Sequence, residues 1–285
     1  FASGKGTKED PYILSTEQQM RDFAVSLTSK LDYSGTYIAL GNDITLTKEW
    51  IPIGEGEYGF NGHFDGRNYS IKGLTIGTKD APYEDGTGEN ARVFFGLFGV
   101  LESGAEVSNL NLDVAIYARG PQTIYVGGLF GYAEEAFIDS VSVSGTVEGY
   151  TTHSAANIYV GGLAGSAIRQ KIVNSSTSAN VRSEAVGGVA EAGGMIGLQN
   201  RGIIVNCYTT GKITGSADRK AEGAPALGGI AGVHAGTIVN CYSKASIIAD
   251  CFTGYVGAMA GWATGIADTF QCYFSFDMTI VTDDK

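Results

Sequence analysis

The segment VGGLFG at 126–131 decides the fold, because related segments return through most of the chain. Six copies follow one another about 32 residues apart, and a fixed period of this size is typical of a repeat architecture. The copies are VFFGLFG at 93–99, VGGLFG at 126–131, VGGLAG at 160–165, AGGMIG at 192–197, LGGIAG at 227–232 and VGAMAG at 256–261.

A second segment follows each copy in fixed order, as in IVNCYTTGKI at 204–213 and IVNCYSKASI at 238–247. Asparagine recurs at one position of this segment, cysteine recurs one position later, and tyrosine follows. The aligned residues are Asn109, Asn174, Asn206 and Asn240, with Ser140 and Gln271 as substitutes; then Cys207, Cys241 and Cys272; then Tyr208, Tyr242 and Tyr273.

The repeat favours a solenoid of short strands. Glycine pairs interrupt each unit and apolar residues alternate, as in VSVSGTV at 141–147, which argues against helical repeats. A propeller blade usually needs more residues than one unit supplies. We therefore predict an all-β, right-handed parallel β-helix, in which aligned asparagines and cysteines form structural ladders from coil to coil. An inward asparagine would need such a neighbour, because an unpaired buried amide is costly.

Residues 15–31 differ from the repeats. Met20, Phe23 and Leu27 follow helical spacing with Ala24 and Leu31, and Thr16 with Gln19 forms a potential capping box. We predict one helix that covers the apolar end of the first coil, with a partner-binding helix as the alternative. The chain is then a single domain, 1–285, in which the cap and first coils occupy 1–76 and the six repeats occupy 93–275.

Composition excludes several classes of function. The chain carries 19 basic and 30 acidic residues, so its net charge of −11 would repel nucleic acid. No apolar run approaches the roughly 20 residues that span a bilayer, so we expect no membrane insertion. The chain starts at Phe1, has no helix to cover its last repeat, and is expected to be part of a longer protein.

The repeated GG-L-x-G followed by I-x-N-C/S-Y resembles the GLUG motif of bacterial surface proteins. The stretches GTKEDPYIL at 6–14, GTYIALGNDITL at 35–46 and FNGHFDGRNYSIKGLTI at 60–76 extend the resemblance over nearly the whole chain. The resemblance implies a β-helix in an extracellular, cell-surface setting. Such repeats occur in adhesin-like proteins and, apart from the catalytic domain, in immunoglobulin-A-cleaving metallopeptidases.

No catalytic residue, metal site or cofactor is predicted. The metallopeptidase signature H-E-x-x-H is absent, and His63, His153 and His234 lie in different units without a ligand at metal-binding spacing. The acids Asp65, Asp113, Asp139, Glu184 and Glu191 occupy different repeat positions, and Asp65 suits an Asx turn. A carbohydrate-active β-helix enzyme, which needs paired carboxylates or a base beside a cation, remains the alternative.

Two further predictions concern aligned side chains. Cys207 and Cys241 are close enough on adjacent coils for a disulfide, but small apolar side chains commonly stack inside solenoids, so we favour buried free thiols. Cys251 falls outside this register. Tyr125, Tyr159 and Tyr255 share one position of the repeat, and Ala185 and Ala226 replace the tyrosine in the repeats between Tyr159 and Tyr255. We expect Tyr125 and Tyr159 to point outward and to offer stacked rings to a sugar face.

The long segments at 78–92, 115–124, 148–158, 182–191 and 215–226 come at one point of each unit. We expect them to be loops that crowd one edge and form the recognition surface. The preferred function is a non-enzymatic extracellular binding, adhesion or spacer module, with host glycans or proteins as partners.

Overall fold

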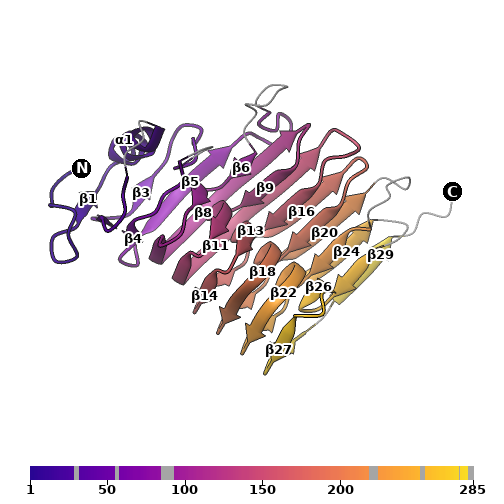
Figure 1. Cartoon of the computed structure of the whole chain (residues 1–285). Helices are drawn as coiled ribbons and strands as arrows, with labels where there is room; N and C mark the ends of the chain where they lie inside the picture. Colours follow the sequence, from indigo (N-terminus) through magenta and orange to yellow (C-terminus); the bar gives the residue numbers. More distant parts are fainter. Residues whose placement is uncertain are drawn as a thin grey trace.

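The computed structural model describes residues 1–28, 32–54, 58–84, 93–217, 224–250, 254–275 and 277–281. These residues form a parallel β-solenoid with one helix near the N-terminus, so the predicted fold class is confirmed. The strands lie side by side from the indigo beginning of the chain to its yellow end (Figure 1). They are hydrogen-bonded into one sheet of 23 strands and one of 6 strands.

Successive repeats place equivalent strands above one another. The 6-stranded sheet contains β6 (Phe94–Phe95), β9 (Ile124–Gly127), β12 (Ile158–Gly161), β17 (Ala190–Gly193), β21 (Ala226–Gly228) and β25 (Tyr255–Gly257). The six copies of the VGGLFG segment are called hexads below. Their second halves begin β7 (Phe98–Leu101), β10 (Phe130–Glu134), β13 (Ala164–Ile168), β18 (Ile196–Val205), β22 (Ala231–Val239) and β26 (Ala260–Ala263).

The rest of each repeat supplies three more stacks. The first has β4 (His63–Asp65), β8 (Glu106–Gly120), β11 (Phe137–Thr151), β14 (Lys171–Val173) and β27 (Asp268–Phe270), together with parts of β18 and β22. The second adds β15 (Ser176–Thr177), β19 (Tyr208–Thr209), β23 (Tyr242–Ser243) and β28 (Tyr273–Phe274). The third has β5 (Ser70–Ile76), β16 (Asn180–Ala185), β20 (Lys212–Ala217), β24 (Ser246–Asp250) and β29 (Asp277–Val281).

The interior is filled by one apolar side chain above another. The hexads contribute Leu129, Leu163, Met195 and Ile230, each 0% exposed. Buried hydroxyl groups bond the backbone carbonyls beside them. Thr177 Oγ1 donates to Gly194 O at 2.9 Å, and Thr209 Oγ1 donates to Gly229 O at 2.6 Å. The buried carbonyls of the glycine turns therefore have partners.

Glycine is required where the 6-stranded sheet turns into the next strand. A Cβ on Gly161 would lie 2.1 Å from Ala164 O and 2.6 Å from Met195 O. Gly193 and Gly228 are equally tight against the backbone of the following coil. The hexad therefore repeats its glycines because two strands meet at a corner with no room for a side chain.

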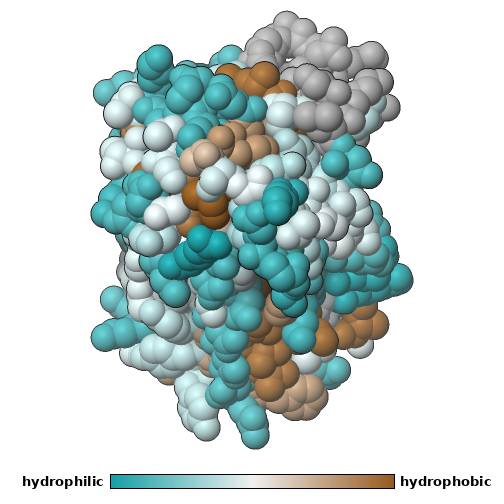
Figure 2. Space-filling view, turned by 90° about the vertical axis from the view of Figure 1, so that its left-hand side faces the viewer, coloured by the Kyte–Doolittle hydropathy of each residue, from teal (hydrophilic) through white to brown (hydrophobic). Residues whose placement is uncertain are grey.

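The helix α1 spans Glu17–Thr28 and follows β1 (Tyr12–Leu14); β2 (Tyr37–Leu40) and β3 (Ile44–Thr45) come after it. Met20, Phe23 and Leu27 are buried, as their spacing predicted, while Leu31 lies outside the described residues. Figure 2 looks onto this end of the solenoid, which is largely hydrophilic with separate hydrophobic patches. The apolar side of the helix is thus turned into the core.

The capping box is formed in part. Gln19 N–H donates to Thr16 Oγ1 at 3.2 Å, as expected. The reciprocal bond differs, because Gln19 Oε1 accepts from Ser15 N–H at 2.7 Å, one residue earlier than the capping-box pattern predicts. Both bonds satisfy donors that a helix start would otherwise leave free.

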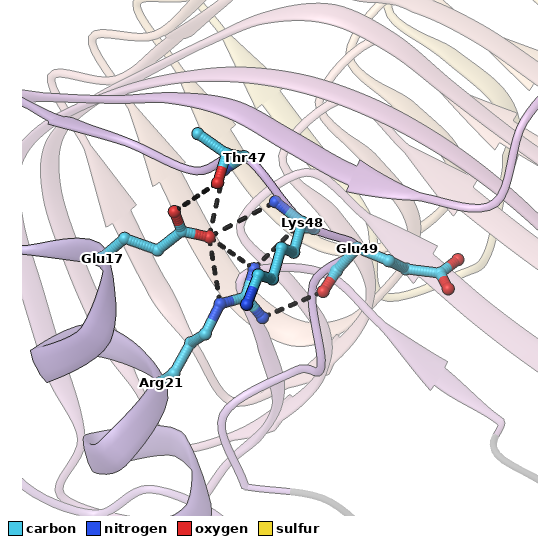
Figure 3. Close-up of polar contacts among 5 residues, drawn as sticks. All are labelled: Glu17, Arg21, Thr47, Lys48 and Glu49. Carbon is cyan, nitrogen blue, oxygen red and sulfur yellow. Dashed lines mark hydrogen bonds and ion pairs between the residues drawn. The ribbon is translucent and has the colours of Figure 1, made fainter.

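A polar network fastens α1 to the first coils (Figure 3). The Glu17 carboxylate accepts from Arg21 Nη2 at 2.7 Å, from Thr47 Oγ1 at 2.7 Å and from Thr47 N–H at 3.0 Å. Arg21 in turn donates to the carbonyls of Lys48 and Glu49. The hydrogen bonds from Thr47 and Arg21 lower the pKa of Glu17 to about 2, so the carboxylate stays charged.

Candidate functional site

The recurring asparagines lie at a sharp bend in every repeat. Asn174, Asn206 and Asn240 have φ of 50°, 54° and 49°, and the substitutes Ser140 and Gln271 share this left-handed conformation. Asparagine tolerates that conformation better than most residues. The backbone bend, and not only the side-chain amide, therefore explains why asparagine repeats here.

The amides also bond from coil to coil. Asn240 Nδ2 donates to Asn206 Oδ1 at 2.8 Å, and Asn206 Nδ2 donates to Asn174 Oδ1 at 3.2 Å. Two of these amides bond an aspartate on the preceding coil. Asn174 Nδ2 donates to Asp139 Oδ1 at 2.9 Å, and Asn109 Nδ2 donates to Asp65 Oδ1 at 3.0 Å. The three later asparagines are exposed, because the left-handed bend turns the side chain outward.

The aligned cysteines lie one residue after this bend and point inward. Cys207 and Cys241 are buried, Cys272 is half-buried, and all three are free thiols. Each sulfur donates to backbone carbonyls, for example Cys207 to Val205 O at 3.2 Å. The hydrogen bond with Cys241 and burial raise the pKa of the Cys207 thiol, which favours the unreactive protonated form. Cys251 lies outside the described residues.

Tyr125 and Tyr159 form a column on the outer side of the 6-stranded sheet. Their ring centroids are 5.1 Å apart with an interplanar angle of 16°, and Phe94 stacks on Tyr125 at 5.3 Å. Both faces of the Tyr125 ring and one face of the Tyr159 ring are therefore covered by a neighbouring ring, and Glu191 follows Tyr159 on the next coil. Sugar stacking needs a free ring face, so this geometry does not favour the expected glycan platform.

The same column contains a residue that sequence alignment missed. Strand pairing places Glu191, not Ala185, above Tyr159, and it places Ala226 above Glu191. Glu191 is 9% exposed, and its Oε2 has no hydrogen-bond partner among the described residues. Burial raises the pKa of Glu191 to about 8, so the carboxyl is neutral at pH 7. Its place directly before the hexad could have revealed it.

The long segments at 115–124, 148–158 and 182–191 leave the solenoid at one edge and are shorter than expected, whereas 85–92 and 218–223 lie outside the described residues. Strand β8 continues to Gly120, β11 to Thr151 and β16 to Ala185, so much of 115–124, 148–158 and 182–191 is strand. Regular outward alternation, as in Tyr117 and Arg119, lets these residues extend the sheet. The connections that remain lie between this stack and the 6-stranded sheet.

A pocket of about 560 Å³ lies at this edge and is called the loop-edge pocket below. Four successive coils contribute to it, namely the coil before the first repeat and the first three repeats, so it depends on the stacking of the coils. It is lined by Lys79, Asp80, Pro82, Arg119, Tyr150, Thr151, Thr152, Arg182, Glu184 and Val186. The lining thus brings three cations and two carboxylates together on an acidic chain.

Tyr150 lies at the centre of this arrangement. Its strand position pairs with Arg119 on one side and with Glu184 on the other. The Arg182 guanidinium lies 5.8 Å from the centroid of the Tyr150 ring and donates from Nη2 to Glu184 Oε2 at 2.8 Å. Tyr150 Oη donates to Glu148, and burial together with this carboxylate raises the pKa of Tyr150.

A second pocket, of about 250 Å³, lies near the N-terminus and is called the N-terminal pocket below. The His63 ring stacks on Tyr37 at 4.1 Å, and His63 Nδ1 lies 2.8 Å from Glu106 Oε2. Lys8, Arg67 and Asp65 also line this pocket. Asp65 Oδ1 accepts from Arg67 N–H at 2.8 Å, so it forms the Asx-type bond that its sequence position indicates.

The remaining sequence candidates are dispersed. His234 is buried in β22, whereas its position in the repeat suggests a turn. Its Nδ1 lies 2.7 Å from Gln199 Oε1, and burial lowers the pKa of His234. His153 lies in the connection after β11. Among the described residues no cluster of three or more His, Cys, Asp or Glu could hold a metal ion. The structure does not bring together Asp65, Asp113, Asp139, Glu184 and Glu191.

No protein-family model matches the chain. A curated protein described as a "Putative Gly-rich membrane protein" of Evansella cellulosilytica is 34% identical over 152 residues. That match covers 50% of this chain and 15% of the relative, so this chain corresponds to a small part of that protein. In the described residues, no helix has the length and apolar character to cross a bilayer.

One solved structure shares the fold of this chain. The structure of a "putative immunoglobulin A1 protease" from Bacteroides ovatus matches 100% of this chain and 83% of its own chain, with a TM-score of 0.62 and 18% identity. This likeness shows the fold alone. The L. reuteri 53608 SRRP aligns over 94% of this chain at 11% identity, but its TM-score of 0.30 is too low to indicate a shared fold.

Proposed function

We propose that this chain is an extracellular surface module that binds glycans at the loop-edge pocket. The observation that carries the proposal is the pocket itself, which combines about 560 Å³ of space with a tyrosine and three cations at the edge where the connections leave the solenoid. Sugars are commonly bound by an aromatic ring flanked by charged and polar side chains, and concave sites of this size fit small ligands.

The surface setting rests on two kinds of support. The repeated motif resembles that of bacterial surface proteins, and the relative from Evansella cellulosilytica is described as a membrane protein. Surface proteins commonly carry several copies of a weak binding site, and multivalency then strengthens attachment to a cell. A passive spacer would need no pocket that depends on side chains from four successive coils.

A glycan array tests this proposal. The whole chain, labelled at its amino groups, should retain a defined group of glycans, and Tyr150→Ala should lose them while the circular dichroism spectrum is unchanged. Lys244→Ala, an exposed residue outside the pocket lining, is the matched control. Equal retention by the Tyr150→Ala variant would place binding elsewhere and contradict the proposal.

The N-terminal pocket favours a second candidate function, carbohydrate processing. Glu106 holds the His63 ring at 2.8 Å, which is the arrangement of an oriented general base, and Lys8 and Arg67 supply cations nearby. A reducing-end assay on a panel of polysaccharides checks this function. Turnover that disappears in His63→Ala would support it, and no turnover by the whole chain would remove it.

A further inference from the structure

The loop-edge pocket gathers cations on an acidic chain. The chain carries a net charge of −11, yet the lining contains Lys79, Arg119 and Arg182, with Asp80 and Glu184 in the lining and Glu84 and Glu148 beside it. The proposed glycan site therefore offers three cationic side chains to a ligand. From this and the geometry below, and resting on the proposed function, we propose that the ligand is a sugar that carries a carboxylate group.

The two arginines are placed to act together. Arg119 pairs in register with Tyr150, and Arg182 pairs with Glu148 two residues away on the same strand. Arg119 therefore lies on the strand beside Tyr150, and the Arg182 guanidinium lies 5.8 Å from the centroid of the Tyr150 ring. A planar carboxylate matches the fork of a guanidinium, which can donate two parallel hydrogen bonds.

Neither arginine is fully used by the protein. Arg119 Nε is 3.9 Å from Glu84 Oε2, which is too long for a hydrogen bond, and its side chain is 49% exposed. Arg182 bonds Glu184 through Nη2, while its Nε has no hydrogen-bond partner among the described residues. The half-exposed guanidinium of Arg119 therefore keeps donors that an anionic ligand requires.

The contacts around the ring hold the site in place before a ligand arrives. Arg182 is fixed between Glu184 and the Tyr150 ring, and Tyr150 is fixed by its bond to Glu148. Glu184 pairing and the neighbouring Glu148 charge raise the pKa of Arg182 more than burial lowers it, so the guanidinium stays charged. Little side-chain freedom is lost on binding, which favours affinity.

The experiment compares three probes that share one disaccharide. Lactose, sialyllactose and sulfolactose are titrated into the whole chain by calorimetry, at low and at physiological salt. We expect sialyllactose to bind at least roughly 10-fold more tightly than lactose, because charge-assisted bonds strengthen binding by about that factor or more. Its advantage should shrink as salt is raised.

Variants locate the effect. Arg119→Gln and Arg182→Gln should each remove most of the preference for sialyllactose over lactose. Arg182→Lys should keep part of the preference, because the charge remains while the planar fork is lost. Lys244→Gln removes an exposed cation outside the lining and should change neither affinity. Circular dichroism of each variant separates a lost contact from a lost fold.

The outcomes separate this inference from the proposed function. Equal affinity for lactose and sialyllactose would overturn the acidic class while glycan binding itself stands. Sulfolactose that binds as tightly as sialyllactose would overturn the requirement for a carboxylate. Binding of none of the three would overturn the inference, and the glycan array with Tyr150→Ala then decides the proposed function separately.

Discussion

The asparagine bend and the loop edge lie on the same coils, but they use their side chains differently. At the bend, Asn174, Asn206 and Asn240 repeat one residue type, one backbone conformation and one hydrogen bond. At the loop edge, equivalent positions carry Arg119, Tyr150 and Glu184, which share no chemistry. Repetition therefore marks positions that hold coils together, and variation marks positions that are free to serve recognition.

The largest effect is expected where the repeat is strictest, at the glycine corner. Gly161→Ala would place a methyl group 2.1 Å from Ala164 O and 2.6 Å from Met195 O, so the backbone must shift. We expect a loss of at least about 3 kcal/mol of unfolding free energy, measured by urea denaturation. Gly265→Ala is the control, since nothing lies within 4 Å of its added methyl group. Equal stability of both variants would contradict a steric role for the corner.

Glu191 breaks the aromatic column and should make stability depend on pH. Its folded pKa of about 8 lies above the ordinary value of 4.5, so folding favours the protonated form. Stability is fully present at acidic pH and falls as pH rises between these values, by on the order of a few kcal/mol. Urea unfolding at about pH 5 and about pH 9 measures this loss. Glu191→Gln should largely remove it, and an unchanged pH profile would rule out Glu191 as its origin.

At the asparagine bend the backbone and the amide can be separated. Asn206→Ala loses both the tolerance of φ 54° and two ladder hydrogen bonds, so we expect a loss of about 1 to 2 kcal/mol. Asn206→Gly keeps the left-handed conformation and loses only the amide, so it should cost less. Thermal unfolding of the two variants checks the order, and an alanine variant at least as stable as the glycine variant would contradict a role for the left-handed backbone.

The smallest effect on stability is expected at the loop edge. Arg119 is half-exposed and its distance to Glu84 is 3.9 Å, so Arg119→Gln should change the unfolding free energy by no more than about 0.5 kcal/mol. The same variant should reduce binding of acidic sugars. A large loss of stability would mean that the loop edge, like the bend, holds coils together.

The fold could be predicted from the sequence because its determinants repeat. Stacked units bury their inner side chains only when equivalent residues align, so period and composition together indicate a solenoid. The orientation of the asparagines could not be read from spacing, because a left-handed residue interrupts the alternation of inward and outward side chains. The helix, in contrast, follows a regular period, so its spacing correctly predicted that Met20, Phe23 and Leu27 are buried.

The candidate site was less predictable, for a physical reason. The loop-edge pocket unites Lys79, Arg119, Tyr150 and Arg182, which come from four successive coils and share no motif. The edge itself was predicted, but the residues that matter belong to strand extensions that looked like loops. Tyr125 and Tyr159 were aligned correctly by sequence, yet sequence alone gives no interplanar angle, and the angle decides whether a ring face is free.

The direction of the strand pairing has a mechanical consequence. Hydrogen bonds between parallel coils run along the solenoid axis, so tension along that axis pulls on each coil-to-coil contact separately. The module should yield coil by coil, and each unit of about 32 residues would release roughly 100 Å of chain when fully extended. Single-molecule stretching would record repeated small steps, whereas one abrupt rupture would contradict this view. A tether of this kind lengthens under flow and keeps its remaining coils folded.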